Sequence, residues 1–360
     1  MRDEIALLAE LVAIPSVSGT EEAIAGFIER TACGWGLDAV RDETSVRIDV
    51  RGRAPGPTLA FVSHLDTVPP GASWTRDPFV PTVEGERLYG RGSGDAKASV
   101  AAMLFAARDL AAGPAPAAGR LLVILGYGEE TRHTSMEQAV GRTGSIDAAI
   151  VGEPTNLDIA VAQRGLMMVD LVARGDQRHA GYAGDDGAGG AFTNAALALA
   201  RDLIRLDRLF DDRAHATLGV ASATPTMLEA GVSRNVTPPT ARAVLDVRST
   251  PAWTHAELAE RMRGALESEV VVTSERLVPC ETPAGSRLLA AAERVRPQGR
   301  RFGSPTCSDW VFVRHADAVK CGPGTSRRSH TPDEYVDLPE VTEARAFYAA
   351  VARAYLEGTG

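Results

Sequence analysis

The stretch TLAFVSHLD, residues 58–66, is an apolar run that ends abruptly in a histidine and an aspartate. A short run of this kind is typical of a strand that is buried on both faces of a sheet. Similar runs occur at residues 121–127 and 148–151, and a helical pattern covers residues 98–110. This alternation predicts an α/β fold with a mostly parallel sheet and helices on both of its faces.

The two ends of the chain carry elements of the same kind. Apolar residues recur at helical spacing over residues 7–12, and Thr20 followed by two glutamates resembles the start of a second helix. A further strand is predicted at residues 318–321 and a closing helix at residues 340–356. Both ends of the chain are therefore expected to belong to the α/β part.

The pattern changes near Gln163. Strands of alternating character are predicted at residues 166–172 and 241–248, around an alanine-rich helix at residues 191–206. The glycine-rich stretch at residues 181–190 is expected to be a flexible loop. A smaller α+β unit inserted into the α/β chain is the simplest interpretation.

The chain length agrees with two domains, because single hydrophobic cores stop growing near roughly 250 to 300 residues and this chain has 360. We expect residues 1–163 and 275–360 to form the main α/β domain and residues 164–274 to form the inserted domain.

Composition excludes several classes of protein. A hydrophobic content of 44% with 24% charged residues is that of a globular protein, and a net charge of -9 makes nucleic acid a poor partner. The chain has no apolar run of membrane-spanning length, and its N-terminus lacks the apolar core of a secretory signal, so we expect a cytoplasmic protein without a membrane partner. Its cysteines lack a CxxC pair, which suits a reducing compartment, and all four are expected to be packing residues: Cys33, Cys280, Cys307 and Cys321.

Polar residues follow the apolar strands, at the edge where open α/β sheets bind their ligands. His64 and Asp66 end the first run, and an aspartate so placed can fix the imidazole tautomer that leaves the other ring nitrogen free for a metal. A structural histidine is the alternative. The glycine-rich turn at residues 90–97 lacks the ending of a phosphate loop and contains Asp95, which suits a carboxylate that bridges two cations.

Three further positions complete the pattern. Glu129 and Glu130 follow the strand at residues 121–127, Glu153 follows the strand at residues 148–151, and His330 lies in a glycine and proline turn. Each alone has a structural alternative, such as a solvated turn for the paired glutamates. Together they offer a mixed nitrogen and oxygen set for two divalent ions such as zinc. One of the paired glutamates then binds metal and the other acts as a base, as amide hydrolysis requires.

In these motifs the chain resembles the M20 metallopeptidase family, which includes acetylornithine deacetylase and succinyl-diaminopimelate desuccinylase. The motifs occur in the family's order along nearly the whole chain: residues 63–66, 90–97, 129–130, 152–154 and 329–335. The resemblance implies that Asp95 bridges two metals, that His64 and Glu153 complete one ion, and that Glu130 and His330 complete the other. It also implies that Asp66 orients His64 and that Glu129 is the general base.

The inserted unit resembles the family's lid and dimerisation domain, which implies a homodimer. His179 matches the position at which the family stabilises the tetrahedral oxyanion, and Asn235 and Arg248 match positions that bind the carboxylate end of the substrate. A surface strand residue is the alternative for Arg248.

The chain departs from the family pattern at two places. The stretch after His179 has glycines where the family has a proline, which puts the shape of the lid in doubt. The loop at residues 131–135 also differs, and His133 within it is expected to be exposed to solvent, with a place in the pocket wall as the alternative.

We therefore expect an enzyme that removes an acyl group, acetyl first, from the amine of a small-molecule substrate such as acetylornithine or acetyl-lysine. The alternatives are a hydrolase that releases lysine or ornithine from an amino-group carrier protein, a desuccinylase and a dipeptidase or carboxypeptidase. A carrier protein would fit arginines near the pocket mouth, such as Arg132, Arg327 and Arg328. A catalytically silent binding protein is the alternative outside the enzymes. Zinc is the expected metal and cobalt or manganese the alternative.

Overall fold

A computed structural model describes residues 2–183 and 192–358 of the chain. The chain forms two compact units. The larger unit contains Met1–Val161, Glu281–Phe302 and Ser308–Gly360, and the smaller unit contains Ala162–Cys280 and Gly303–Cys307.

A nine-stranded sheet forms the centre of the larger unit, in the order β1-β2-β6-β3-β7-β17-β8-β15, with β16 paired to β8. Its four central strands run parallel: β6 (Arg120–Gly126), β3 (Thr58–His64), β7 (Ala148–Val151) and β17 (Asp317–Lys320). The flanking strands β2 (Ser45–Arg51) and β8 (Ile159–Gln163) pair antiparallel with β6 and β17, and β1 (Asp38–Arg41) pairs antiparallel with β2. The short strands β15 (Cys280–Glu281) and β16 (Arg301–Ser304) lie next to β8. The predicted mostly parallel sheet is confirmed.

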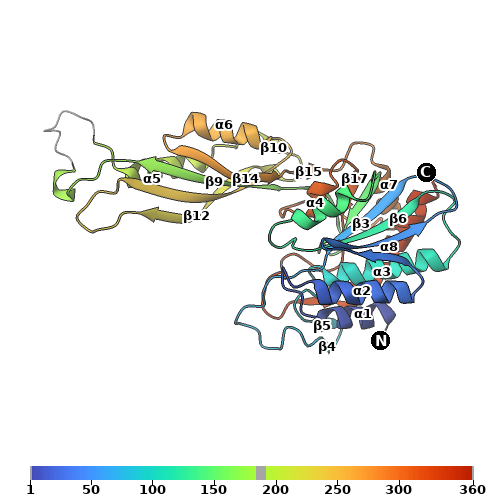
Figure 1. Ribbon diagram of the computed structural model, residues 1–360. Helices are drawn as coiled ribbons and strands as arrows, with labels where there is room; N and C mark the ends of the chain where they lie inside the picture. The colour runs from blue at the N-terminus through green and yellow to red at the C-terminus, as the bar shows by residue number, and fades with distance from the viewer. Residues whose placement is uncertain (1, 184–191, 359–360) are drawn as a thin grey trace. The chain divides into compact units, whose positions relative to one another are not determined.

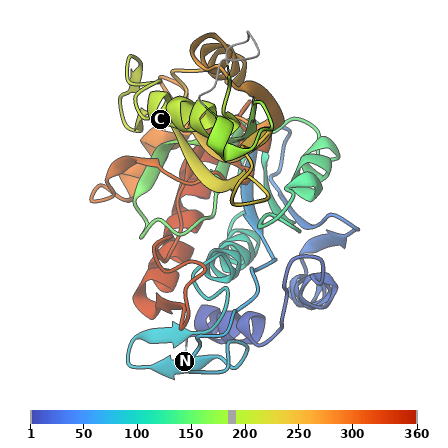
Figure 2. The same ribbon diagram turned by 90° about the vertical axis from the view of Figure 1, so that its left-hand side faces the viewer.

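Helices cover both faces of this sheet. On β6, Leu121, Val123 and Leu125 belong to the main hydrophobic core that also contains α3 (Lys97–Ala112) and α8 (Leu338–Leu356). Successive side chains of a strand point to opposite faces, so Gly126 faces the other way, where it lies against Met136 of α4 (Thr134–Gly141). Figures 1 and 2 show α8 running beside α3.

The remaining elements of the larger unit lie around this frame. A small sheet next to α1 (Figure 2) joins β4 (Thr82–Glu84), β5 (Arg87–Tyr89) and β18 (Tyr335–Asp337). The other helices are α1 (Asp3–Val12), α2 (Glu22–Gly34), α7 (Arg287–Val295) and the 3-10 helix η2 (Asp309–Phe312). The two predicted N-terminal helices and the closing helix are present.

The smaller unit has a separate core and an antiparallel sheet in the order β12-β13-β9-β14. The strands are β9 (Gly165–Arg174), β12 (Ser222–Ala230), β13 (Thr240–Ser249) and β14 (Glu269–Leu277). The helices are α5 (Ala195–Leu206), α6 (His255–Ala265) and the short η1 (Ala180–Tyr182), and β10 (Ala214–His215) pairs with β11 (Gly219–Val220). This is the α+β architecture that the change of pattern predicts.

The predicted start of the alanine-rich helix is wrong. Residues 192–194 are not helical, and α5 begins at Ala195 because the side chain of Asn194 accepts hydrogen bonds from the N–H groups of Ala196 and Leu197. This is an N-cap, which ends the helix on its N-terminal side. Of the loop predicted at residues 181–190, residues 184–190 lie outside the described residues.

The four cysteines are free thiols, and Cys280 and Cys321 are buried as predicted. Cys33 is exposed, so its assignment as a packing residue is wrong. It lies in the last turn of α2, where the apolar face of the helix is formed by other residues. Among the described residues, no helix is long and apolar enough to cross a membrane.

Candidate metal centre

The carboxyl ends of the parallel strands bring the predicted polar residues together. His64 is the last residue of β3, Glu129 and Glu130 follow β6, and Glu153 follows β7. Parallel strands end at the same edge of a sheet, which is where open α/β sheets bind ligands. Asp95 reaches this edge from the turn that precedes α3.

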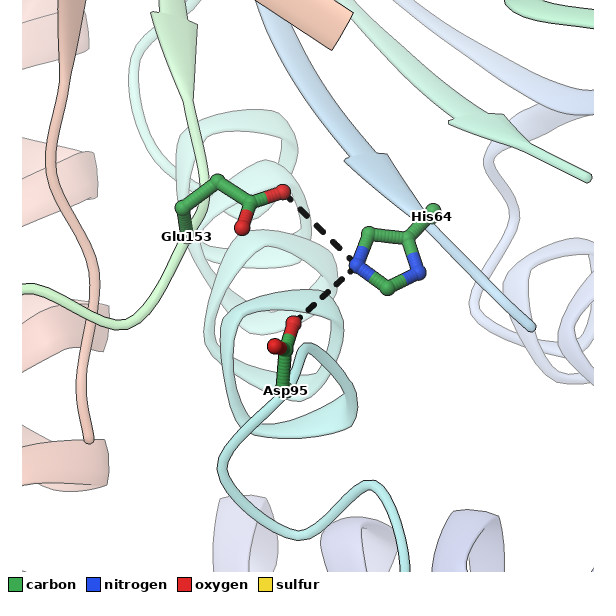
Figure 3. A group of neighbouring side chains, drawn as sticks. All are labelled: His64, Asp95 and Glu153. Carbon is green, nitrogen blue, oxygen red and sulfur yellow. Dashed lines mark hydrogen bonds and ion pairs between the residues drawn. The ribbon is translucent and has the colours of Figure 1, made fainter. Parts of the chain in front are cut away.

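The first group of candidate metal ligands consists of His64, Asp95 and Glu153 (Figure 3). The Nε2 atom of His64 lies 3.2 Å from Oδ1 of Asp95 and 3.6 Å from Oε1 of Glu153. The two carboxylates converge on one ring nitrogen from different elements. One imidazole and two carboxylates are a ligand set that suits zinc.

The second group consists of Asp95, Glu130 and His330. The Nε2 atom of His330 lies 2.9 Å from Oε2 of Glu130 and 3.9 Å from Oδ2 of Asp95. Asp95 is therefore common to both groups, and it offers a different oxygen to each histidine. The structure brings together all five residues predicted as metal ligands.

Asp66 fixes two parts of the site at once. Its Oδ1 atom lies 3.4 Å from Nδ1 of His64 and accepts a hydrogen bond from the N–H of Glu129 at 3.0 Å. Its Oδ2 atom accepts hydrogen bonds from the N–H of Glu130 and from the hydroxyl of Ser18. Burial raises the pKa of Asp66, but the hydrogen bonds from His64 and Ser18 outweigh this effect and lower the pKa to about 2.

The turn that carries Asp95 is held by Glu334. This buried carboxylate pairs with Arg91 at 2.6 Å and accepts hydrogen bonds from the N–H groups of Gly92, Gly94 and Asp95. Gly92 has a φ of +81°, and a Cβ atom there would lie 2.7 Å from Cγ2 of Thr67, so the turn requires glycine at this position. The Asp95–Ala96 peptide bond is cis.

The buried carboxylates fit divalent cations. Burial and then the charge of Asp95 raise the pKa of Glu153 to about 8. The Oε1 atom of Glu153 is buried and has no hydrogen-bond partner among the described residues. Buried charges are paired or bind metals. A buried carboxylate oxygen that lies next to Asp95 and His64 without a hydrogen-bond partner is therefore expected of a metal ligand.

Glu129 belongs to neither of these two groups, and it lies with His133 and Asp309 in a third cluster of potential ligands that does not include Asp95. Its carboxylate is buried, and burial raises its pKa well above the ordinary value. An imidazole nitrogen, Nδ1 of His133, lies 3.7 Å from Oε1 of Glu129 and 3.0 Å from Oδ1 of Asp309.

The prediction that His133 is exposed is wrong. Its side chain is only 12% exposed, because the backbone at His133 turns through a φ of 53° and directs the ring inward toward Asp309.

The three predicted residues of the inserted unit lie within the smaller unit. His179 is exposed, its Nδ1 atom accepts a hydrogen bond from the N–H of Gly181, and it forms a β-bridge with Val236. Asn235 is therefore close to His179 along the paired backbone.

Arg248 lies on β13, further along the chain than His179 and Asn235. Its guanidinium binds Asp246 through two hydrogen bonds of 2.7 and 2.9 Å. It is partly buried.

Several residues around the site were not singled out from the sequence. Asp309 and Ser18 carry no motif that marks them. Glu334 and Lys97 lie inside quoted motifs, but no periodicity indicates their contacts. The ammonium of Lys97 is fully buried and donates hydrogen bonds to the carbonyl oxygens of Leu11 and Ile14 at 3.0 and 2.9 Å.

Residues 60–354 match peptidase family M20/M25/M40. The chain is 30% identical to a succinyl-diaminopimelate desuccinylase of Cereibacter sphaeroides, over 98% of this chain and 99% of that protein. It is 29% identical to the corresponding protein of Xanthomonas campestris, over 98% and 99% of the two chains.

Solved structures share the fold. An M20 family metallo-carboxypeptidase from Sulfolobus solfataricus aligns with a TM-score of 0.78 at 20% identity, over 99% of this chain and all of that one. A dinuclear metal-binding peptidase of the M20 family from Bacillus subtilis aligns with a TM-score of 0.76 at 20% identity, over 98% of each chain.

Proposed function

The chain belongs to peptidase family M20/M25/M40 and is a metal-dependent hydrolase, and from this we propose that it cleaves the amide bond of an N-acylated amino acid. A succinylated diamino acid is the first candidate substrate. The products are the free amino acid and the carboxylic acid of the acyl group. An enzyme of amino-acid biosynthesis would perform such a step.

One observation supports this proposal above the others. Asp95 is shared by two groups of ligands, and Glu129, which precedes Glu130 in the chain, belongs to neither of them. A base must reach the attacking water without being consumed as a ligand. Asp95 would help to hold both ions, and Glu129 would remain free to act as the base.

The metals supply one part of the chemistry and the side chains supply the rest. When bound, two divalent ions polarise the scissile carbonyl and make water more acidic. We propose zinc as the native metal and cobalt as the alternative, because an imidazole and carboxylate set accepts both. His64 and Glu153 would hold one ion, Glu130 and His330 the other, and Asp95 both.

Glu129 would carry the proton. As a carboxylate it takes a proton from the attacking water and then delivers it to the amine nitrogen as the C–N bond breaks. The Asp66 carboxylate would hold Glu129 and His64 in place through the contacts described above. His179 would donate a hydrogen bond to the oxyanion that forms on the carbonyl oxygen.

Arg248 and Asn235 are proposed to bind the carboxylate end of the substrate. A guanidinium grips a carboxylate through two parallel hydrogen bonds, and Arg248 already makes this type of contact with Asp246. A substrate carboxylate would have to compete with Asp246 for the same donors.

Two acyl groups are candidates for the group that is removed. Succinyl is favoured because the curated relatives at 29–30% identity over their whole length are named succinyl-diaminopimelate desuccinylases. Acetyl, on ornithine or lysine, is the second candidate, because the His330–Val336 segment resembles the acetylornithine and acetyl-lysine deacetylases.

The proposed partner is a second copy of the chain, joined through the smaller unit. Large apolar side chains are exposed on its edge strand β12 and on α5, namely Met227, Leu228, Leu197 and Ile204. Exposed apolar patches of this kind mark protein interfaces. A sedimentation measurement tests this, with a dimer expected at micromolar concentration and a monomer contradicting it.

An amino-group carrier protein is the alternative source of substrate. Arg132 and Arg327 are exposed, as a surface that receives an acidic carrier would require. Hydrolysis of a carrier-linked amino acid, with no turnover of free acylated amino acids, would favour this alternative.

The proposed function is tested with the zinc-loaded protein and a panel of amides: succinyl-diaminopimelate, acetylornithine, acetyl-lysine and simple dipeptides. We expect preferential release of succinate, abolished by EDTA and restored by zinc or cobalt. Preference for an acetylated substrate would replace succinyl by acetyl, and activity that persists in EDTA would contradict metal-dependent hydrolysis.

A further inference from the structure

We propose that His133 and Asp309 form a positioning pair that holds the carboxylate of Glu129 in the orientation needed for proton transfer. The inference rests on the proposed role of Glu129 as general base, and it adds two residues to the machinery of the site. Neither residue is a ligand in the two groups that share Asp95.

The hydrogen-bond geometry fixes the imidazole of His133. Its Nδ1 atom lies 3.0 Å from Oδ1 of Asp309, whose side chain is only 3% exposed. A carboxylate can only accept, so Nδ1 carries the hydrogen. The same N–H edge of the ring lies 3.7 Å from Oε1 of Glu129. The single hydrogen on Nδ1 points to Asp309, so the ring edge that Asp309 aligns meets the carboxylate of the base through packing and not through a second hydrogen bond.

The backbone around His133 is built for this orientation. The N–H groups of Arg132 and His133 both donate to the carbonyl oxygen of Gly128 at 3.0 Å, which closes a tight turn directly after Glu129. His133 has a φ of 53°, in the left-handed region that residues other than glycine rarely adopt. Such conformations persist where the surrounding structure requires them, and they cluster at functional sites.

Asp309 is equally well fixed on the other side. It is the first residue of η2, and it is followed by Trp310, which is buried. A Cβ atom on Gly126 would lie 3.7 Å from Oδ2 of Asp309, so the carboxylate fits against the bare end of β6. The ring of His133 also packs against Phe312 of η2, with 6.3 Å between the ring centroids.

Glu129 needs such support because its side chain has few restraints of its own. Its backbone is held by Asp66, but the described contact of its carboxylate with a histidine is the 3.7 Å approach to His133. Buried carboxylates surround it, and Asp309 is one of those whose charge acts on it. A displacement of about 1 Å at a reacting group can cost roughly a hundredfold in rate. A ring edge held in place on one side of Glu129 opposes such a displacement.

The test compares two substitutions that tolerate the backbone at His133. Glycine and asparagine both adopt positive φ readily, but only asparagine keeps an N–H donor next to Cγ, where Nδ1 lies. For His133→Gly we expect kcat to fall about tenfold to a hundredfold with KM within about twofold. His133→Asn is expected to keep kcat within about threefold of the wild type. Zinc content should equal that of the wild type in both.

The matched control is His315→Gly. His315 is exposed and precedes β17, at the edge of the sheet opposite to the metal centre. The His315→Gly substitution should leave kcat unchanged. Any amide that the wild type hydrolyses serves as substrate, so a wrong assignment of the acyl group would not affect the comparison.

A double-mutant cycle tests whether the two residues act as one unit. Asp309→Ala, which removes the acceptor, should lower kcat about as much as His133→Gly, and the double variant should lose no more than the worse of the two single variants. Independent losses that multiply would contradict a pair.

Two further results would overturn the inference. The first is unchanged kcat in His133→Gly. The second is an equal loss in the glycine and asparagine variants together with loss of zinc, which would indicate a purely structural role. Crystal structures of the two zinc-loaded variants give a reading independent of activity. The Glu129 carboxylate should be displaced in His133→Gly and retained in His133→Asn.

Discussion

Glu334 accepts a hydrogen bond at 3.0 Å from the backbone N–H of Asp95, a residue that lies 239 positions earlier in the chain. This contact ties the turn that carries the shared metal ligand to the opposite end of the sequence. The position of Asp95 therefore depends on a carboxylate that binds no metal itself. Residues that orient metal ligands in this way typically change metal affinity by 10–100-fold when they are replaced.

Glu334→Gln is expected to weaken zinc binding by about tenfold or more and to lower the free energy of unfolding by roughly 3 kcal/mol, because Arg91 is left as a buried charge without its partner. Competition with a chelator measures the first effect and denaturant unfolding the second. Glu86→Gln, at an exposed position before β5, is the matched control. Wild-type zinc affinity in Glu334→Gln would contradict this role.

Glu129→Ala is expected to keep both metals and to lower kcat by about two to four orders of magnitude, the usual contribution of a general base. Metal analysis and steady-state kinetics on the same preparation check the two parts. Glu130→Ala should differ by losing metal, because Glu130 lies 2.9 Å from His330 within the second group. Full activity in Glu129→Ala would remove this residue from the mechanism.

His179→Ala is expected to lower kcat by about a hundredfold, the effect of removing one donor to an oxyanion. Metal content should stay the same, because the described contacts of His179 lie within the smaller unit. A parallel loss of metal and activity would show that His179 has been assigned the wrong task. His215→Ala, in the same unit, is the control.

The metal-free protein is expected to become less stable as the pH rises from about 5 to about 8. Burial raises the pKa of Glu153 to about 8, whereas in the unfolded chain it is near 4.3. Between these values the folded state binds more protons than the unfolded state, so the free energy of unfolding falls with rising pH. Burial lowers the pKa of His64, but its hydrogen bonds to Asp66 and Asp95 raise it well above the ordinary value, which acts in the same direction.

Thermal melting of EDTA-treated protein at several pH values measures this effect. Added zinc should reverse the trend, because metal binding requires deprotonated ligands. Glu153→Gln should flatten the dependence in the metal-free protein, since glutamine does not titrate. A melting temperature that is constant between pH 5 and 8 without metal would contradict the expected dependence.

The central sheet was predictable because each parallel strand is an uninterrupted apolar run that ends in a polar residue. His64 and Glu153 follow such runs directly, so their meeting at one edge follows from the direction of β3 and β7. Glu129 and Glu130 are different, because both follow the same strand. Only the resemblance to the family assigned one as base, and the structure places Glu130 with His330 and leaves Glu129 apart from both groups.

The pairing of His133 with Asp309 was not predictable from the sequence. These residues are 176 positions apart, and Asp309 lies in a short 3-10 helix rather than after a strand. The inward turn of His133 depends on a positive φ that no motif marks. The same is true of the start of α5, since a single side chain, Asn194, decides where the helix begins.

The contacts of Lys97 bear on where the functional part of the chain starts. The match to the family begins at residue 60, which suggests that α1 is dispensable. However, the Lys97 ammonium donates hydrogen bonds to the carbonyl oxygens of Leu11 and Ile14, at the end of α1 and just beyond it. Lys97 is also only two residues from Asp95. A chain that begins at residue 16 would retain every catalytic side chain. It would nevertheless leave the buried ammonium of Lys97 without these acceptors, next to the turn that carries Asp95. The minimal active fragment therefore includes an N-terminal helix that contributes no ligand.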